Sequence, residues 1–142
     1  FMNFRTNEKL PPLDFPENFF DIIYCISVFT HLDEKEQIKW LEELKRILKP
    51  KGFLLLSLHG FENLKNEKHI ERAKNLGIIK NGFVFCKIKS PIKRIILGNS
   101  TTKLAYHTKH YVFETYSKIF KIVKYVDNGI ANHQDLIVLQ KD

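Results

Sequence analysis

Apolar residues gather in a few short runs separated by polar segments. Residues 21–29 are almost continuously apolar and rich in β-branched side chains, and residues 53–58 form a second run of this kind. A strand that is apolar on both faces is typical of the interior of a parallel sheet. We therefore predict two buried strands, over 21–29 and 53–58, with the first covered on both faces.

The segment between these two runs has a helical spacing. Its apolar residues recur at steps of three or four and form one stripe: Ile38, Leu41, Leu44, Ile47 and Leu48. Asp33 and Glu36 have the spacing of a capping box, and we interpret them as caps rather than as an acid–base pair. Pro50 ends the helix and Gly52 supplies the turn that follows. A strand, a helix and a strand in this order predict a parallel βαβ unit with a right-handed crossover.

The pattern in the rest of the chain is weaker. Residues 5–20 are predicted to be irregular because they contain three prolines. The other predicted elements are a helix within 62–75, a strand over 82–88, a helix from Thr108 to about Phe120, and strands over 121–126 and 134–140. Residues 90–105 give no prediction. Asp127-Asn128-Gly129 favours a chain reversal, so the last two strands are predicted to form an antiparallel pair.

The composition narrows the class of protein. With 142 residues the chain has room for one ordinary domain, and 44% of its residues are apolar. No apolar run approaches the roughly 20 residues of a membrane-spanning helix. Cys25 and Cys86 both lie in apolar runs, so we interpret them as reduced core residues and expect a cytoplasmic protein.

Positive charge is concentrated in the middle of the chain. Residues 61–124 hold 14 lysine and arginine residues against 4 acidic residues, whereas residues 1–60 hold 8 against 9. Such a stretch suits an anionic partner, including nucleic acid. A lysine-rich solvated surface is the interpretation we favour, because the lysines are scattered and no nucleic-acid-binding motif accompanies them.

Several segments, in this order, resemble the class I S-adenosylmethionine-dependent methyltransferases. Leu13 to Tyr24 (LDFPENFFDIIY) is similar to a characteristic stretch of the family, and Ser27 to Leu32 (SVFTHL) continues this similarity up to the following helix. Leu44 to Leu54 (LKRILKPKGFL) resembles the next helix-to-strand turn, where Lys51 replaces the first of two usual glycines. Gln134 to Leu139 resembles the last strand of a subgroup that includes methyltransferases of surface-sugar assembly.

This resemblance implies a cofactor and a place for it. In the family, ligands lie beyond the carboxyl ends of the strands, as in other open α/β sheets. By resemblance, the cofactor S-adenosylmethionine would lie against Asn7, Cys25, Ile26 and His31. The acceptor, a small molecule or a saccharide intermediate, would lie near Ser27, Phe29 and Tyr106. The implied reaction moves a sulfonium methyl group to a nucleophilic atom, and His31 is a candidate general base.

The family's glycine-rich loop and its ribose-binding acidic residue have no counterpart in these residues. The six glycines stand at 52, 60, 77, 82, 98 and 129, and no two are close enough to form such a loop. We therefore expect residues 1–142 to form a single, incomplete methyltransferase-like domain with a variable insertion at 61–107. Its expected fold class is α/β: part of a Rossmann-like sheet, with the βαβ unit, a helical insertion and the antiparallel pair.

The incomplete pattern leaves alternatives open. The missing neighbour of the 21–29 strand predicts either a homodimer through that strand's edge or an N-terminal partner segment. The chain alone would then bind S-adenosylmethionine weakly or not at all. A non-catalytic remnant that serves as an interaction module is the second hypothesis, and a nucleic-acid-binding surface within 61–124 is the third. His107 and His110 have the spacing of a metal pair, but we favour surface histidines; His59 and His133 flank strand ends and receive no role.

Overall fold

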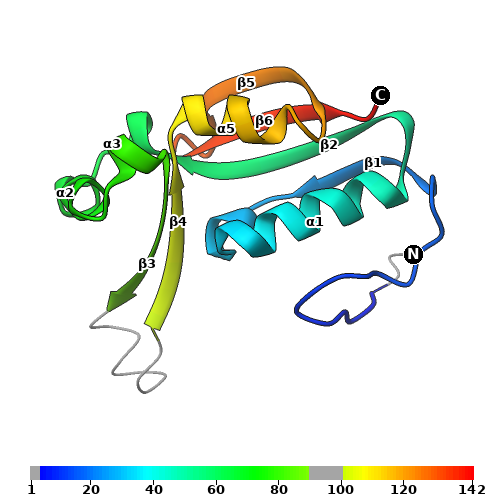
Figure 1. The fold of residues 1–142 in the computed structure, drawn as a ribbon, viewed down its shortest axis with the longest axis horizontal. Coiled ribbons are helices and arrows are strands. Elements are labelled where there is room, and N and C mark those ends of the chain that lie inside the picture. The colour runs from blue at the N-terminus through cyan, green and yellow to red at the C-terminus, as the bar shows by residue number, and fades with distance from the viewer. Residues whose placement is uncertain (1–3, 90–100) are drawn as a thin grey trace.

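The first half of the chain forms the predicted βαβ unit. The computed structural model describes residues 4–89 and 101–142. Strand β1 (Phe20–Cys25), helix α1 (Glu34–Ile47) and strand β2 (Leu48–Gly60) follow one another, with a short 3-10 helix, η1 (Phe29–His31), after β1. Strands β1 and β2 are parallel, with Ile23 opposite Leu54 and Cys25 opposite Leu56. Helix α1 lies along this pair of strands (Figure 1).

Helix α1 begins at the predicted capping box. The Glu36 backbone N–H donates to Asp33 Oδ1 at 2.9 Å, and the Asp33 N–H donates to Glu36 Oε2 at 3.0 Å. The interpretation of these two residues as caps is therefore confirmed. The predicted apolar stripe is also confirmed, since Leu41, Leu44 and Ile47 are buried.

The connection from α1 to β2 is shorter than we expected, because no residue separates the helix from the strand. The helix ends at Ile47 and the strand begins at the next residue, so β2 is longer than the predicted 53–58. The left-handed backbone conformation falls on Lys51, whose φ is 64°, and not on Gly52. Gly52 is needed for a different reason: a Cβ there would lie 2.8 Å from the Asp21 carbonyl oxygen and 2.9 Å from that of Lys49.

Strand β1 differs from its prediction in length and in burial. It ends at Cys25, and residues 26–29 form a bend and the start of η1. Within the described residues β1 pairs with β2 alone. One face packs in the core, but on the other face Ile22 is 60% exposed and Tyr24 74% exposed. The prediction of a strand covered on both faces is thus wrong for this chain, because no element of the described part covers that second face.

Residues 61–107 form a small unit with its own core. It contains η2 (Phe61–Asn63), α2 (Glu67–Asn75), α3 (Ile78–Asn81), β3 (Phe83–Lys89) and β4 (Thr101–His107). Strands β3 and β4 are an antiparallel hairpin that extends away from α1 in Figure 1. The helix within 62–75 and the strand at 82–88 are confirmed, whereas β4 was not predicted. Of the segment without a prediction, residues 90–100 lie outside the described residues.

The C-terminal part confirms the antiparallel pair but moves its turn. Helix α5 (Lys109–Tyr116) is shorter than predicted, and it leads to β5 (Lys121–Ile130) and β6 (Gln134–Gln140). The reversal lies at residues 131–133, where Ala131 and Asn132 have φ values of 50° and 53°. The predicted reversal at 127–129 is wrong, because those residues belong to an irregular part of β5 in which the Asn128 N–H donates to Asp135 Oδ1.

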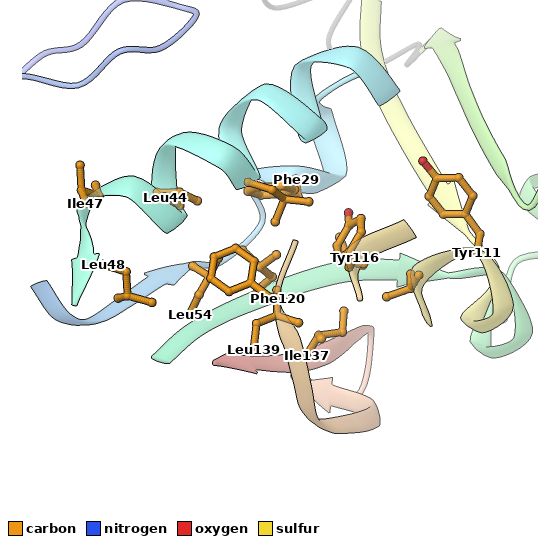
Figure 2. Packing of buried hydrophobic residues seen from close by; sticks show 14 residues of the cluster. Phe29, Leu44, Ile47, Leu48, Leu54, Tyr111, Tyr116, Phe120, Ile137 and Leu139 are labelled. Carbon is orange, nitrogen blue, oxygen red and sulfur yellow. The ribbon is translucent and has the colours of Figure 1, made fainter. Parts of the chain in front are cut away.

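The main core lies on one face of the sheet. Strands run in the order β3-β4-β2-β6-β5, with β1 also beside β2. Side chains alternate between the faces of a strand, and one face of β2 and β6 packs against both α1 and α5 (Figure 2). The opposite face carries half-buried apolar residues: Phe53, Leu55, Leu136 and Val138. The α/β class and the partial Rossmann-like sheet are as expected.

Candidate functional site

The parallel strands bring their carboxyl ends to one edge of the sheet. Strand β1 ends at Cys25, opposite Leu56, and β2 continues to Gly60. Strand β4 is parallel to β2 and ends beside it, with Gly60 opposite His107. Ligands of open α/β sheets bind outside the carboxyl ends of the strands. The residues that follow β1 and those that end β2 and β4 are therefore the candidate site.

The turn after β1 is fixed by side chains from two other strands. The Ser27 N–H donates to Ser57 Oγ at 2.7 Å, and Gln134 Nε2 donates to Ser27 Oγ at 3.0 Å. Ser27 has a φ of 59°, which is uncommon for a residue with a side chain. Strained backbone held in place by its surroundings is frequent at functional sites. Ser27 thus lies in the turn at the carboxyl end of β1, and its hydroxyl is hydrogen-bonded to Gln134 of β6.

His31 is held against β4 rather than against β1. Its Nδ1 lies 2.8 Å from the Lys103 carbonyl oxygen. Because a carbonyl oxygen only accepts, Nδ1 carries the hydrogen and Nε2 of the neutral ring is the acceptor. The side chain is exposed, at the end of η1. This arrangement leaves Nε2 able to receive a proton.

An apolar cavity of about 410 Å³ lies beside the open edge of β1. Asn7, Cys25 and Phe29 all line it, together with Val28 and Trp40. Burial raises the pKa of the Cys25 thiol to about 11, so this thiol stays protonated at neutral pH. The Asn7 amide is exposed and donates to the Glu8 carbonyl oxygen. Three of the seven predicted site residues therefore meet in this cavity.

Ile26 and Tyr106 lie outside the cavity, and Phe29 is mainly a core residue. Ile26 is partly exposed in the bend after β1 and is not part of the cavity lining. Phe29, although it lines the cavity, is 1% exposed and belongs to the main core. Tyr106 lies at the end of β4 in the second core. The structure thus separates the seven residues into four places: a cavity beside β1, the Ser27 turn, the end of β4, and η1, where His31 contacts Lys103.

Four rings form a row at the ends of β2 and β4, which we call the His59–Tyr106 row. The centroid distances are 5.3 Å from His133 to His59, 5.8 Å from His59 to Tyr106, and 6.0 Å from Tyr106 to His69. Burial, followed by repulsion from His133, His31 and His69, lowers the pKa of His59 to about 4. We predicted no role for His59 and His133 from the sequence. The sequence contains only one indication of a role for these two histidines, which is that each stands at the end of a predicted strand.

His107 corrects a prediction. We expected a surface histidine, but its side chain is fully buried and its Nε2 lies 2.9 Å from Gln37 Oε1. Burial lowers the pKa of His107 to about 3. The prediction failed because the spacing of the two histidines gives no information on tertiary packing: His107 is the last residue of β4 and contacts Gln37 of α1. His110 is exposed and lies 3.3 Å from Glu114.

Within residues 4–89 and 101–142, no group of three or more histidine, cysteine, aspartate or glutamate side chains converges as a metal site would require. In the same part of the chain, no helix combines the length and the apolar composition needed to cross a bilayer.

Comparison with known proteins identifies the fold. Residues 5–56 match the model of a family described as a methyltransferase domain. A methyltransferase from Methanosarcina mazei shares 19% identity and a TM-score of 0.62, over 92% of this chain and 63% of its own. A Listeria monocytogenes protein shares 12% identity and a TM-score of 0.63, over 92% and 65%. A glycopeptide N-methyltransferase solved with S-adenosylmethionine shares 15% identity and a TM-score of 0.59, over 98% and 64%.

The chain therefore has part of the class I S-adenosylmethionine-dependent methyltransferase fold. It spans less than two thirds of the length of these three solved structures. The family match covers the stretch from the loop before β1 to the middle of β2, which contains Asn7, Cys25, Ser27 and His31. The resemblance that the sequence motifs indicated is confirmed.

Proposed function

We propose that this chain takes part in the transfer of a methyl group from S-adenosylmethionine to a small-molecule or saccharide acceptor. The observation that carries this proposal is the Ser27 turn. It lies at the carboxyl edge of a parallel strand pair, it is held in a strained conformation by Ser57 and Gln134, and it falls within the residues that match a methyltransferase domain.

The cavity beside β1 fits part of such a cofactor. Its volume of about 410 Å³ and its apolar lining suit a flat ring, with the Asn7 amide available to a polar ring edge. We propose that Asn7, Cys25, Ile26 and His31 contact the cofactor. Ser27 and Tyr106 would contact the acceptor, and Phe29 would support this region as a wall of the cavity.

The residues of this chain would contribute by position. When bound, S-adenosylmethionine supplies an already activated methyl group, so alignment and exclusion of water can provide much of the rate. The apolar cavity wall excludes water on one side, and the fixed Ser27 turn orients the acceptor on the other. His31 Nε2 would accept a proton from the acceptor, since Nδ1 already donates to the Lys103 carbonyl oxygen.

We further propose that the open edge of β1 pairs with another strand. The edge has no strand partner in the described residues, and Ile22 and Tyr24 leave an apolar surface beside it. Unpaired strand edges readily pair with other chains. The added strand would come either from a second copy of the chain or from polypeptide that supplies more of the methyltransferase fold, of which residues 1–142 would form one incomplete domain. We also expect the protein to act in the cytoplasm.

Sedimentation tests the edge proposal. Wild-type chain should form dimers or larger species, and Ile22→Lys should shift it toward monomer because a charge at this edge disfavours pairing. Ile79→Lys is the matched control, since Ile79 is an exposed isoleucine on α3, away from β1. A wild-type chain that remains a stable, folded monomer at high concentration would contradict the proposal.

Calorimetric titration with S-adenosylmethionine and S-adenosylhomocysteine tests the function. We expect weak binding to the 142-residue chain, because it holds no glycine-rich loop, and stronger binding when the added strand is supplied. Asn7→Ala should weaken binding further, whereas Asn75→Ala on α2 should not. Complete absence of binding with the edge paired would favour the non-catalytic interaction module, and salt-dependent retention on immobilised RNA or DNA would favour a basic surface within 61–124.

A further inference from the structure

Four tyrosines of this chain are buried or half-buried, and they differ in the hydrogen bonding of their hydroxyl groups. The hydroxyl groups of three of them donate hydrogen bonds: Tyr111 to Glu34 Oε1 at 2.8 Å, Tyr116 to Gln37 Oε1 at 2.7 Å, and Tyr125 to Asp135 Oδ2 at 2.6 Å. Tyr106 is 1% exposed, and its hydroxyl has no partner. A buried hydroxyl without a partner is destabilising, so its retention needs an explanation.

The ring of His59, which neighbours that of Tyr106, also has a buried polar atom without a hydrogen-bond partner. His59 is 7% exposed, and its Nδ1 is buried without a hydrogen-bond partner. The His59 and Tyr106 rings lie 5.8 Å apart between centroids, and the two residues are register partners at the ends of parallel strands. The two unpaired polar groups thus belong to neighbouring rings at the edge of the sheet where ligands bind.

The pair adjoins the Ser27 turn. Ser57, which accepts the Ser27 N–H, precedes His59 by two residues and lies on the same face of β2. Gln134, which contacts the Ser27 hydroxyl, follows His133 directly. His133 is exposed and His69 half-buried, so the outer rings of the His59–Tyr106 row lie toward solvent. A ligand that enters past these outer rings would reach the unpaired groups.

The chemistry of the pair selects a class of ligand. A neutral imidazole nitrogen either donates or accepts, according to the tautomer, and a tyrosine hydroxyl does both. A hydroxyl group satisfies the pair in either tautomer, because it can donate to one partner and accept from the other. A carboxylate only accepts and an ammonium only donates, and each would also bring a charge into a buried place. His59 stays neutral because its pKa lies well below 7.

Asp135, the acidic residue near His59, does not change the class of ligand that the pair selects. Asp135 is fully buried, and hydrogen bonds from Asn63, Tyr125 and the Asn128 N–H occupy both of its oxygens. We propose that His59 and Tyr106 bind a neutral, hydroxyl-bearing methyl acceptor, with the hydroxyl hydrogen-bonded between them. This proposal rests on the proposed function and specifies its acceptor.

Stability of variants gives the first test. Tyr106→Phe removes an unpaired hydroxyl, so its urea-unfolding midpoint should equal or exceed that of the wild type. Tyr111→Phe is the matched control and should lower the midpoint, because it removes the bond to Glu34. A Tyr106→Phe midpoint below that of the wild type would mean that the hydroxyl has a structural partner, which would overturn the proposal.

Ligand titration gives the second test, with cyclohexanol, cyclohexanecarboxylate and cyclohexylamine as probes of one ring size. The histidine and tyrosine ring signals of the whole chain are followed by NMR. Cyclohexanol should shift the His59 and Tyr106 signals, and Tyr106→Phe should weaken its apparent affinity by roughly tenfold, as loss of one hydrogen bond predicts. Preference for either charged probe, or no shift of these signals with any probe, would overturn the proposal.

S-Adenosylhomocysteine titration separates this proposal from the proposed function. Its binding should be equal in wild type and in Tyr106→Phe, because Tyr106 does not line the cavity beside β1. Cyclohexanol binding without any cofactor binding would contradict the methyltransferase function and leave a hydroxyl site. Cofactor binding without cyclohexanol binding would contradict the hydroxyl site alone.

Discussion

At the scale of single residues, Lys51 and Gly60 show how close contacts restrict side-chain choice. Lys51 holds a left-handed conformation, with a φ of 64°, at the start of β2. Its backbone N–H and carbonyl oxygen bond to Lys141 and Gln140, which fix the conformation. Gly60 packs directly against the Asp135 carboxylate, which is fully buried. Lys51 thus carries a side chain that its backbone conformation disfavours, and Gly60 has no space for a side chain.

We predict that Lys51→Gly stabilises the fold by up to about 1 kcal/mol, because glycine adopts a positive φ without steric cost. Urea unfolding measures the change. Lys39→Gly, at an exposed position inside α1, is the control and should destabilise by about 1 kcal/mol. A loss of stability in both variants would show that the Lys51 side chain contributes more than its backbone costs.

We predict that Gly60→Ala destabilises the fold by roughly 2–4 kcal/mol. The new Cβ would overlap the Asp135 carboxylate and disturb its bonds to Asn63, Tyr125 and Asn128. Thermal unfolding checks the loss. In an Asp135→Ser background the same change should cost much less, because the overlapping group is gone, and equal costs in both backgrounds would exclude this mechanism.

At the scale of elements, Gln37 joins the two halves of the chain. It is fully buried on α1, and its Nε2 donates to the carbonyl oxygens of Phe29 at 2.8 Å and Leu32 at 3.2 Å. Its Oε1 accepts from Tyr116 of α5 and from His107 of β4. Since the amide oxygen accepts, the His107 hydrogen resides on Nε2. Helix α1 is therefore positioned by polar contacts as well as by its apolar stripe.

We predict that Gln37→Leu costs roughly 3 kcal/mol or more, because two buried donors and a buried carbonyl oxygen lose their partner. Equilibrium unfolding in urea measures this cost. Gln140→Leu is the control, since Gln140 makes one exposed hydrogen bond to Lys51 and should change stability by less than about 0.5 kcal/mol. A Gln37→Leu variant as stable as the control would show that solvent replaces the network.

At the scale of the whole molecule, two buried histidines make the fold sensitive to acid. The pKa of His59 is lowered to about 4 and that of His107 to about 3. Below the ordinary histidine pKa of about 6.5, the unfolded chain binds protons that the folded chain does not. The contribution of the two neutral histidines to the free energy of unfolding is therefore fully present above pH 6.5, and it is lost as the pH falls toward 4.

We predict a slope of about 1.4 kcal/mol per pH unit for each histidine in this window, or roughly 2.7 kcal/mol per unit for both. Urea midpoints measured between pH 7 and pH 4.5 give the slope. His59→Phe should reduce the slope by about half, because it removes one of the two buried histidines. Identical slopes in wild type and His59→Phe would contradict the burial argument.

The accuracy of the sequence predictions followed the range of the interactions concerned. The capping box, the apolar stripe of α1 and the βαβ unit depend on residues close in sequence, and all three were predicted. The burial of His107 depends on contacts with α1 and β2, more than 40 residues away, and it was not predicted. Strand β4 pairs with β3 along its whole length, and it was not predicted because residues 90–105 have no clear pattern. The reversal near Asp127 was misplaced because pairing with β6 keeps Asp127-Asn128-Gly129 in the strand.

The α/β class, the parallel strand pair with its helix and the resemblance to methyltransferases could be predicted from the sequence. These follow from local periodicity, capping and the order of short motifs. Which polar groups meet depends on the tertiary structure. The unpaired His59 and Tyr106 atoms, the Gln37 network and the open face of β1 arise from the packing of distant segments, and no local pattern specifies which neighbour a buried side chain receives.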